Sequence, residues 1–238
     1  MESTFSYKRI MLKLSGEALK GDSSTPYSED AIKAIVERVR IILAEGVEVA
    51  IVVGAGNLWR GATRGSGMDR VNADYMGMLG TVMNALNLKE HFNMAGIPAM
   101  VQCSVNMEPI ARKFNREDAV KALESGQVVI FGGGTGSPYF TTDTTAALRA
   151  LEVNCGAVMK ATKVNGIYTA DPMKDPTAKK FDKLTFAEAI SGRFKVMDSA
   201  AFSLCSDNNL AIIVFNFDEP GALAKVLAGD YSVGTVVS

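Results

Sequence analysis

The chain has 238 residues, of which 47% are hydrophobic and 21% are charged, and its formal net charge is −1. This length and composition are sufficient for a substantial core and fit either one large α/β domain or two closely joined lobes. A net charge so close to zero excludes a bulk attraction to nucleic acid or to a membrane surface, so an anionic ligand must be held by local groups.

The cysteine and histidine content limits the chemistry further. Three cysteines, Cys103, Cys155 and Cys205, are odd in number and far apart, which predicts reduced thiols in a cytoplasmic protein. The polar start of the chain contains no signal-peptide core, and no apolar run approaches the roughly 20 residues of a membrane helix. The single histidine, His91, argues against a histidine-rich metal site, and we expect no metal held by the protein itself.

Short apolar runs alternate with helical patterns along the chain. The runs predict strands over 9–14, 47–53, 97–103, 127–131, 156–160 and 210–215, with an edge strand over 235–237. Cap residues and helical spacing predict helices over 29–45, 69–95, 115–124, 144–151, 199–209 (capped by Asp198) and 219–228, and one beginning at Thr185. We therefore expect an α/β three-layer sandwich: a mostly parallel sheet with helices on both faces and a ligand crevice at the carboxyl ends of its strands.

Two lysines interrupt the apolar runs. Lys13 lies inside the first predicted strand, just before Ser15-Gly16, and Lys160 ends the fifth. A lysine in a buried strand is costly unless its ammonium reaches an anion or solvent. The alternative for Lys13 is an edge strand whose lysine reaches solvent along its apolar stem.

Three glycine loops lie at the ends of predicted strands. The richest, Gly132–Gly136, leads to Thr141, Thr142 and Asp143, just before a helical pattern. Glycine lets backbone N–H groups approach a ligand closely, and a helix N-terminus offers free donors and a partial positive charge. An anion site is one interpretation, and a tight turn between strand and helix is the other.

The loop 54–61 and the helical pattern after it carry two more candidates. Arg60 is either a fork for phosphate or a solvated loop arginine. Asp74 is either an exposed carboxylate near the helix start or an acceptor for ligand hydroxyls. The helix 69–95 is apolar on more than one side, which favours a subunit interface.

Asn165-Gly166 lies between two short β-prone pieces and predicts a β-hairpin.

Common phosphate-binding motifs are missing: the sequence contains no Gly-Lys pair for a Walker A loop and no G-x-G-x-x-G fingerprint. A different set of groups is present, namely two strand-end lysines, bare glycine amides and an aspartate.

This set suits phosphoryl transfer between two anionic substrates, where the protein contributes alignment and preorganised positive charge. A lysine about 4 Å from an anion contributes on the order of 4 kcal/mol at an effective dielectric near 20. Asp143 would orient both Lys13 and Lys160 and would not act as a base, because a phosphate acceptor is already ionised.

Five segments in the same order, 13–19, 54–61, 74–79, 134–143 and 160–172, resemble the amino acid kinase superfamily and, within it, bacterial-type uridylate (UMP) kinases. The resemblance covers nearly the whole chain. It implies ATP-dependent conversion of UMP to UDP in pyrimidine nucleotide biosynthesis, Mg²⁺ carried with ATP, inhibition by UTP and a homohexamer. It also implies one domain over 1–238, with an acceptor-binding lobe over 1–155 and an ATP-binding lobe over 156–238.

The resemblance assigns roles residue by residue. Lys13, Lys160 and Asp143 would be catalytic. The ATP-binding residues would be Lys13, Leu14, Ser15, Gly16, Gly56, Arg60, Thr162, Tyr168 and Asp171. The UMP-binding residues would be Ala55, Arg60, Asp74, Thr135, Gly136, Ser137, Pro138, Tyr139, Phe140, Thr141 and Thr142.

Two positions depart from the family pattern. Ala55 stands where a third glycine is usual, so its backbone can contact a ligand only with a negative φ. The loop 21–27 lacks the glycine–aromatic–glycine pattern of members activated by GTP.

Two other functions remain as alternatives. A related enzyme acting on a carboxylate or carbamate would share the ATP half, but Asp74 and the run 135–142 argue against it. A catalytically inactive nucleotide-binding regulatory or storage protein on the same fold should lack one of Lys13, Asp143 and Lys160, and this sequence has all three.

Overall fold

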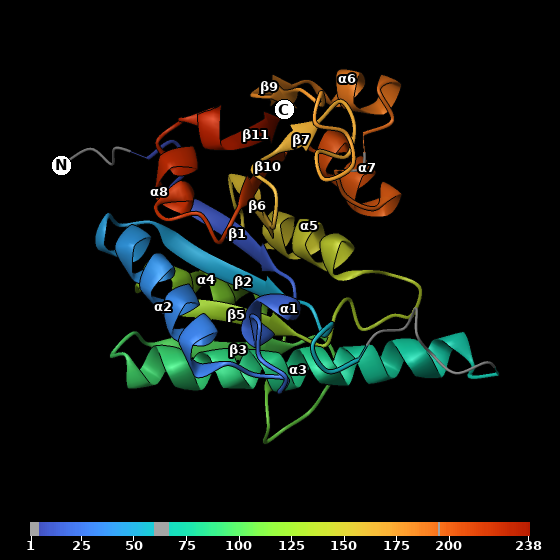
Figure 1. The fold of residues 1–238 in the computed structure, drawn as a ribbon. Coiled ribbons are helices and arrows are strands. Elements are labelled where there is room, and N and C mark those ends of the chain that lie inside the picture. Colours follow the sequence, from blue (N-terminus) through green and yellow to red (C-terminus); the bar gives the residue numbers. More distant parts are fainter. Residues whose placement is uncertain (1–4, 60–66, 195) are drawn as a thin grey trace.

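A computed structural model describes residues 5–59, 67–194 and 196–238 and shows a central nine-stranded sheet (Figure 1). The strand order is β4-β3-β5-β2-β1-β6-β10-β11-β9. The strands are β1 (Arg9–Leu14), β2 (Glu48–Val53), β3 (Ala99–Cys103), β4 (Arg112–Lys113), β5 (Val128–Gly132), β6 (Ala157–Thr162), β9 (Lys183–Leu184), β10 (Ala211–Asn216) and β11 (Gly234–Val237). Every neighbouring pair is parallel except β10 and β11, so the predicted mostly parallel sheet is confirmed.

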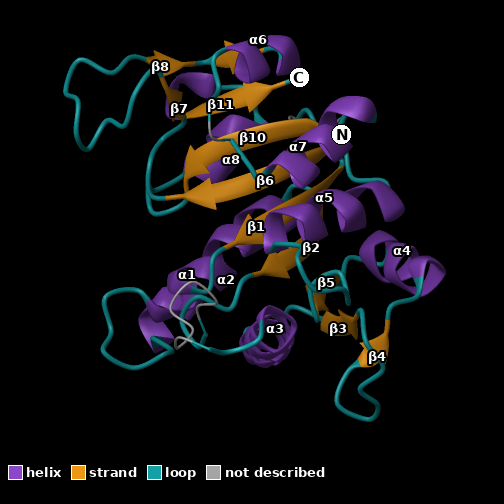
Figure 2. Cartoon of the chain, turned by 90° about the vertical axis from the view of Figure 1, so that its right-hand side faces the viewer, coloured by secondary structure: helices purple, strands orange, loops and turns teal. Residues whose placement is uncertain are grey.

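Helices cover both faces of this sheet (Figure 2). They are α1 (Glu17–Lys20), α2 (Glu29–Ala44), α3 (Arg70–Met94), α4 (Arg116–Glu124), α5 (Thr142–Glu152), α6 (Phe186–Ser191), α7 (Ser199–Asp207) and α8 (Ala222–Leu227), with a short 3₁₀ helix at Tyr231–Val233. Helices α2, α3 and α8 contribute to one buried cluster, and α4, α5, α6 and α7 contribute to the other. Alternate residues of β1 point into the two clusters, since Ile10 and Leu12 belong to the first and Met11 to the second.

Polar caps begin most helices where the sequence predicts them. Ser28 accepts a hydrogen bond from the Ala31 amide at the start of α2, and Thr185 and Glu188 form a capping box on α6. Helix α5 begins earlier than predicted, because Thr141 is its N-cap and Asp143 already lies in its first turn. Helix α8 begins later than predicted, because Gly221 adopts a left-handed φ of 74° just before it.

Helix α3 is apolar on two sides, as the sequence indicates. Its inner side buries Met78, Val82 and Leu88, whereas Leu79 and Met83 are more than half exposed. Within the described part of the chain, no helix combines the length and the apolar character needed to cross a membrane.

Strand β11 is not the edge of the sheet, contrary to the prediction. After the turn-rich segment, Lys183 and Leu184 return to pair in parallel with Val236 and Val237, so β9 covers that side. The edge prediction failed because a two-residue strand carries no recognisable pattern in the sequence.

The hairpin predicted at Asn165-Gly166 is also wrong. Thr162 stays in β6, paired with Asn216, and the next strand, β7 (Ile167–Tyr168), pairs instead with β8 (Lys180–Phe181). The Ile167 amide donates to Thr235 Oγ1 at 2.8 Å. This bond directs the chain after β6 toward β11, so it does not fold back to pair with β6.

Replacing Thr235 with valine should lower the free energy of unfolding by about 1–3 kcal/mol, because the buried Ile167 amide would lose its acceptor. The same hydroxyl donates to the Phe181 carbonyl, which would lose its donor. Denaturant titration would measure the change, with Thr235→Ser as a control that keeps the hydroxyl. A valine variant as stable as the parent would contradict this account of the turn.

Candidate active site

Lys13 and Lys160 lie side by side on neighbouring strands. β1 and β6 are parallel and pair Lys13 directly with Lys160. β1 lies between β2 and β6 in the middle of the sheet, which overturns the alternative of an edge strand. Because both side chains point the same way from the sheet, their ammonium groups reach the same space, with exposed fractions of only 13% and 19%.

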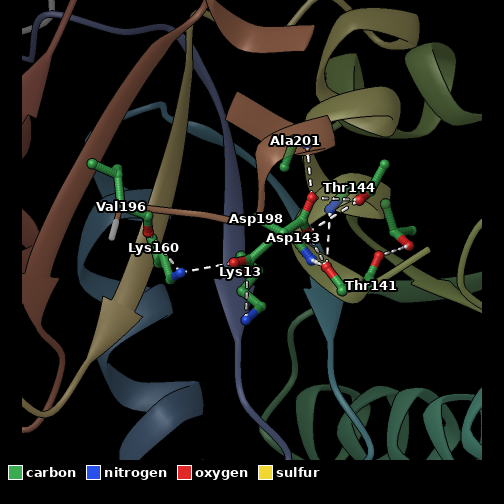
Figure 3. A network of polar contacts seen from close by, with 9 residues as sticks. Lys13, Thr141, Asp143, Thr144, Lys160, Val196, Asp198 and Ala201 are labelled. Atoms are coloured by element: carbon green, nitrogen blue, oxygen red, sulfur yellow. Dashed lines mark hydrogen bonds and ion pairs between the residues drawn. The ribbon is translucent and has the colours of Figure 1, made fainter. Parts of the chain in front are cut away.

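Asp143 lies between the two ammonium groups. Lys13 Nζ is 2.7 Å from its Oδ1, and Lys160 Nζ donates to its Oδ2 at 2.7 Å (Figure 3). Burial alone would raise the pKa of Asp143, but the charges and hydrogen bonds of Lys13 and Lys160 outweigh it and hold the pKa below its ordinary value. One carboxylate facing two ammonium groups leaves a local excess of positive charge.

Two glycine loops meet beside Lys13. A methyl group on Gly16 would lie 2.6 Å from the Gly56 nitrogen and 2.8 Å from the Gly54 oxygen, so only glycine fits there. The buried side chain of Asn84, on α3, donates to the Gly54 carbonyl at 2.7 Å and pairs with Asn57. Asn84 was not predicted, although a polar residue on the buried side of a helix was a signal that could have found it.

The third glycine loop, between β5 and α5, is held from two sides. The Gly133 amide donates to Thr81 Oγ1 at 2.9 Å, and Ser104 Oγ donates to the Gly134 carbonyl. Gly133 has a φ of 78°, and a methyl group there would lie 2.6 Å from Cys103 Sγ. Neither Thr81 nor Ser104 was predicted, because single hydroxyl residues carry no distinctive pattern.

Asp74 faces the same loop from α3. It accepts a hydrogen bond from the Tyr139 amide at 2.8 Å, and its two oxygens share the single N–H of Arg70 Nε at 2.8 and 2.9 Å. The Arg70 guanidinium also lies over the Tyr139 ring, 5.3 Å from its centre. Tyr139 has a φ of 73°, an uncommon conformation for a non-glycine residue, and the bond to Asp74 helps to hold it.

Three cavities surround these residues. The first, of about 230 Å³, is lined by Ala55, Trp59, Arg70, Ala73, Asp74, Gly77, Met78, Thr81, Gly134, Phe140, Thr141 and Thr142. The second, of about 510 Å³, contains Lys13, Ser15, Lys160 and Thr162 in its wall. The third, of about 470 Å³, shares Lys160 and Thr162 with the second and adds Tyr168 and Asp171.

Gly54 lies between the backbone of Gly16 and the hydroxyl of Thr142. A methyl group on it would be 3.4 Å from the Gly16 nitrogen and 3.5 Å from Thr142 Oγ1. Thr142 lines the first cavity and Ser15, the neighbour of Gly16, lines the second, so Gly54 lies between residues that adjoin both cavities.

The predicted site residues fall into groups. Ala55, Asp74, Phe140, Thr141 and Thr142 are brought together in the first cavity. The run from Thr135 to Tyr139 lies on the loop leading to them, outside that cavity wall.

Three predicted ATP-binding residues need separate comment. The side chain of Leu14 is fully buried in the core, so only its backbone is available. Gly56 adjoins Gly16 through its backbone nitrogen. Arg60 lies outside the described residues.

The three cysteines lie in the core. All three are free and buried. Burial raises the pKa of Cys155 and of Cys205 to about 12, and for Cys205 the charges of Asp143 and Asp198 add to the effect. Both thiols are therefore protonated and unreactive at neutral pH.

Two further observations concern ligands. A larger cavity, of about 660 Å³, lies at the β4–β3 edge of the sheet and against α4, with Lys89, Arg112 and Lys121 in its wall. In the ranges that the structure describes, no group of three or more His, Cys, Asp or Glu side chains is placed to hold a metal ion.

A three-layer α/β fold with glycine loops beside two paired strand lysines, and without a Walker A loop, is the arrangement of a separate class of kinases. The family model described as "Amino acid kinase family" matches residues 8–216, and the chain belongs to this family. The resemblance read from the five sequence segments is thereby confirmed.

Solved structures of uridylate kinases are similar over nearly the whole chain. The UMP kinase of Bacillus anthracis is 38% identical with a TM-score of 0.94, over 98% of this chain and 96% of that one. The UMP kinase of Ureaplasma parvum is 36% identical with a TM-score of 0.92, over 97% and 98% of the two chains. The uridylate kinase of Archaeoglobus fulgidus is 26% identical with a TM-score of 0.72, over 96% and 99%.

Proposed function

We propose that the protein transfers the terminal phosphoryl group of ATP to UMP and forms UDP and ADP. The observation that carries the proposal is the sharing of Asp143 by Lys13 and Lys160, at 2.7 Å each, beside a cavity that Lys13 and Lys160 both line. The similarity to structures named UMP kinases supports the choice of acceptor.

UMP would occupy the cavity lined by Ala55, Asp74 and Thr142. Asp74 would accept hydrogen bonds from the ribose hydroxyls, since its side chain borders the cavity and Arg70 holds it in place. The acceptor phosphate would bind at the N-terminus of α5, where the Thr142 hydroxyl offers a donor and the helix dipole favours an anion. The loop from Thr135 to Phe140 would close over the nucleotide.

ATP would occupy the two cavities that meet at Lys160 and Thr162. Its phosphates would lie against Lys13, Ser15 and Gly16, and its nucleoside against Tyr168 and Asp171. Mg²⁺ would enter with ATP, on the phosphate oxygens. The protein would act in the cytoplasm, which fits its three free cysteines.

In the transfer step, the acceptor phosphate oxygen attacks the γ-phosphorus in line, and the bond to the leaving ADP oxygen breaks. Negative charge spreads over the equatorial oxygens, and Lys13 and Lys160 stabilise it because they are already fixed at that position. Asp143 holds both ammonium groups and removes no proton, because the acceptor oxygen carries none at neutral pH.

The proposal extends to organisation. The acceptor site would belong to the lobe 1–155 and the ATP site to the lobe 156–238. The exposed apolar side of α3, with Leu79 and Met83, would form a subunit contact in a homohexamer.

Inhibition by UTP would follow from its uridine half, which the acceptor cavity would accept. An inactive regulatory or storage protein is disfavoured, since Lys13, Asp143 and Lys160 remain in contact.

The acceptor assignment is tested by incubating the protein with Mg-ATP and each nucleoside monophosphate in turn. We expect kcat/KM for UMP to exceed that for CMP by about ten- to a hundredfold. Uracil and cytosine exchange donors and acceptors on one edge, and each unpaired buried group costs about 1–3 kcal/mol. Equal rates with UMP and CMP would overturn the assignment, and nucleotide binding with no turnover would favour the inactive alternative.

A further inference from the structure

Helices α5 and α7 begin close together at the predicted transfer site (Figure 3). The N-cap of α5 is Thr141, and the N-cap of α7 is Asp198. The sequence indicates Asp198 only as a cap. Its carboxylate does more than that, since it is hydrogen-bonded to side chains of both helices.

Asp198 binds one amide and two hydroxyl groups. Its Oδ1 accepts from the Ala201 amide at 2.9 Å, which is the capping bond of α7. Thr144 Oγ1 lies 3.1 Å from both carboxylate oxygens, and Thr141 Oγ1 donates to Oδ2. A carboxylate at this position can only accept, so both threonine hydroxyls must donate to it.

Because Thr141 must donate to Asp198, its hydroxyl can act only as an acceptor toward the first turn of α5. A threonine hydroxyl has one proton, and here that proton points to Asp198. The lone pairs of Thr141 Oγ1 are then free to accept from the Asp143 amide at 3.0 Å and from the Thr144 amide. Asp198 therefore sets the direction of the hydrogen bonds that hold the first turn of α5, which contains Asp143 and Thr142.

The residues just before Asp198 bind the other side of the same cluster. The Val196 carbonyl accepts a hydrogen bond from Lys160 Nζ at 2.7 Å. Val196 and Asp198 thus contact Lys160 and the start of α5 respectively, on both sides of the Lys160–Asp143 ion pair. A shift of this segment would move both partners of that pair.

We infer that Asp198 is a positioning residue for phosphoryl transfer, which holds the start of α5 so that Asp143 meets both lysines and Thr142 faces the acceptor. The inference rests on the proposed function and adds a residue to it. Asp198 touches neither substrate in this arrangement, and its effect passes through Thr141 and Thr144.

The test is Asp198→Asn, assayed with Mg-ATP and UMP. Asparagine keeps an oxygen for the Ala201 amide, so α7 retains its cap. Its amide nitrogen is a donor, however, and would oppose the hydroxyl protons of Thr141 and Thr144. We expect kcat to fall about tenfold or more and KM for UMP to rise severalfold, while KM for ATP changes by less than about twofold.

Two further variants separate positioning from simple stability. Asp198→Ser keeps a capping hydroxyl but is too short to reach both threonines, and it should reproduce the kinetic change. Asp230→Asn, in a capping aspartate that binds Ser232 elsewhere in the chain, should leave all three constants unchanged. Adding Thr141→Ala to Asp198→Asn should cost little more than the larger single change, because both act on one connection.

The outcomes distinguish the inference from the proposed function. A parent enzyme that phosphorylates UMP, with Asp198→Asn showing parental kcat and both parental KM values, would overturn the inference alone. The same holds if the variant loses thermal stability while its active fraction keeps parental constants. No turnover of UMP by the parent would overturn the proposed function, and the inference with it.

Discussion

Alanine in place of Lys13 or Lys160 should lower turnover of UMP by about 10²-fold or more. Each ammonium group is fixed before substrates arrive, and removing one preorganised donor to a developing charge typically costs about 10²- to 10³-fold in rate. The two groups adjoin one another across Asp143, so neither can take over the position of the other. Steady-state kcat with Mg-ATP and saturating UMP measures the effect.

An exposed lysine provides the matched control. Lys33 lies on the surface of α2 beside Glu29, and Lys33→Ala should leave turnover unchanged. Arginine at position 13 or 160 is a stricter comparison, because it keeps the charge but presents a planar fork that does not match a compact ammonium. Near-parental turnover in either alanine variant would remove that lysine from the mechanism.

The pairing of the two lysines illustrates what the sequence could predict. Lys13 lies one residue before the end of its apolar run and Lys160 ends another, and the carboxyl ends of parallel strands meet at one edge of a sheet. A shared site was therefore predictable, and so was Asp143 at the start of a helix. The order of strands was not, because nothing in the runs themselves states that β1 lies between β2 and β6.

The unpredicted residues depend on contacts between distant segments. Asn84 holds Gly54 from a helix 30 positions away, and Thr235 takes the amide that a hairpin at Asn165-Gly166 would have used. The preference of an Asn-Gly pair for a hairpin turn stabilises less than a hydrogen bond between a buried amide and an acceptor elsewhere in the fold. Asp198 was recognised as a cap from its neighbours, but its bonds to Thr141 and Thr144 required the fold.

Replacing Asp143 with asparagine should lower turnover by about 10²-fold or more and should also destabilise the protein. Asparagine has the same shape but no charge, so Lys13 and Lys160 would face each other without their shared counterion. Breaking a buried ion pair by removing one partner costs about 3–5 kcal/mol, and the partial exposure of both lysines places the expected loss near the lower value. Turnover and denaturant titration at pH 7 measure the two effects, with the exposed turn variant Asp175→Asn as the control.

The pH dependence of stability identifies the carboxylate as the cause. The folded pKa of Asp143 lies below its ordinary value of 3.8, so the folded state favours the charged form. Its contribution to stability is then fully present above that ordinary value and is lost as the pH falls through the folded pKa. The difference in unfolding free energy between the parent and Asp143→Asn should therefore be constant near neutral pH and shrink in acid. If the difference in unfolding free energy stayed constant down to the lowest pH at which the protein folds, Asp143 would contribute shape rather than charge. Full turnover in Asp143→Asn would mean that the two lysines need no counterion to hold their positions.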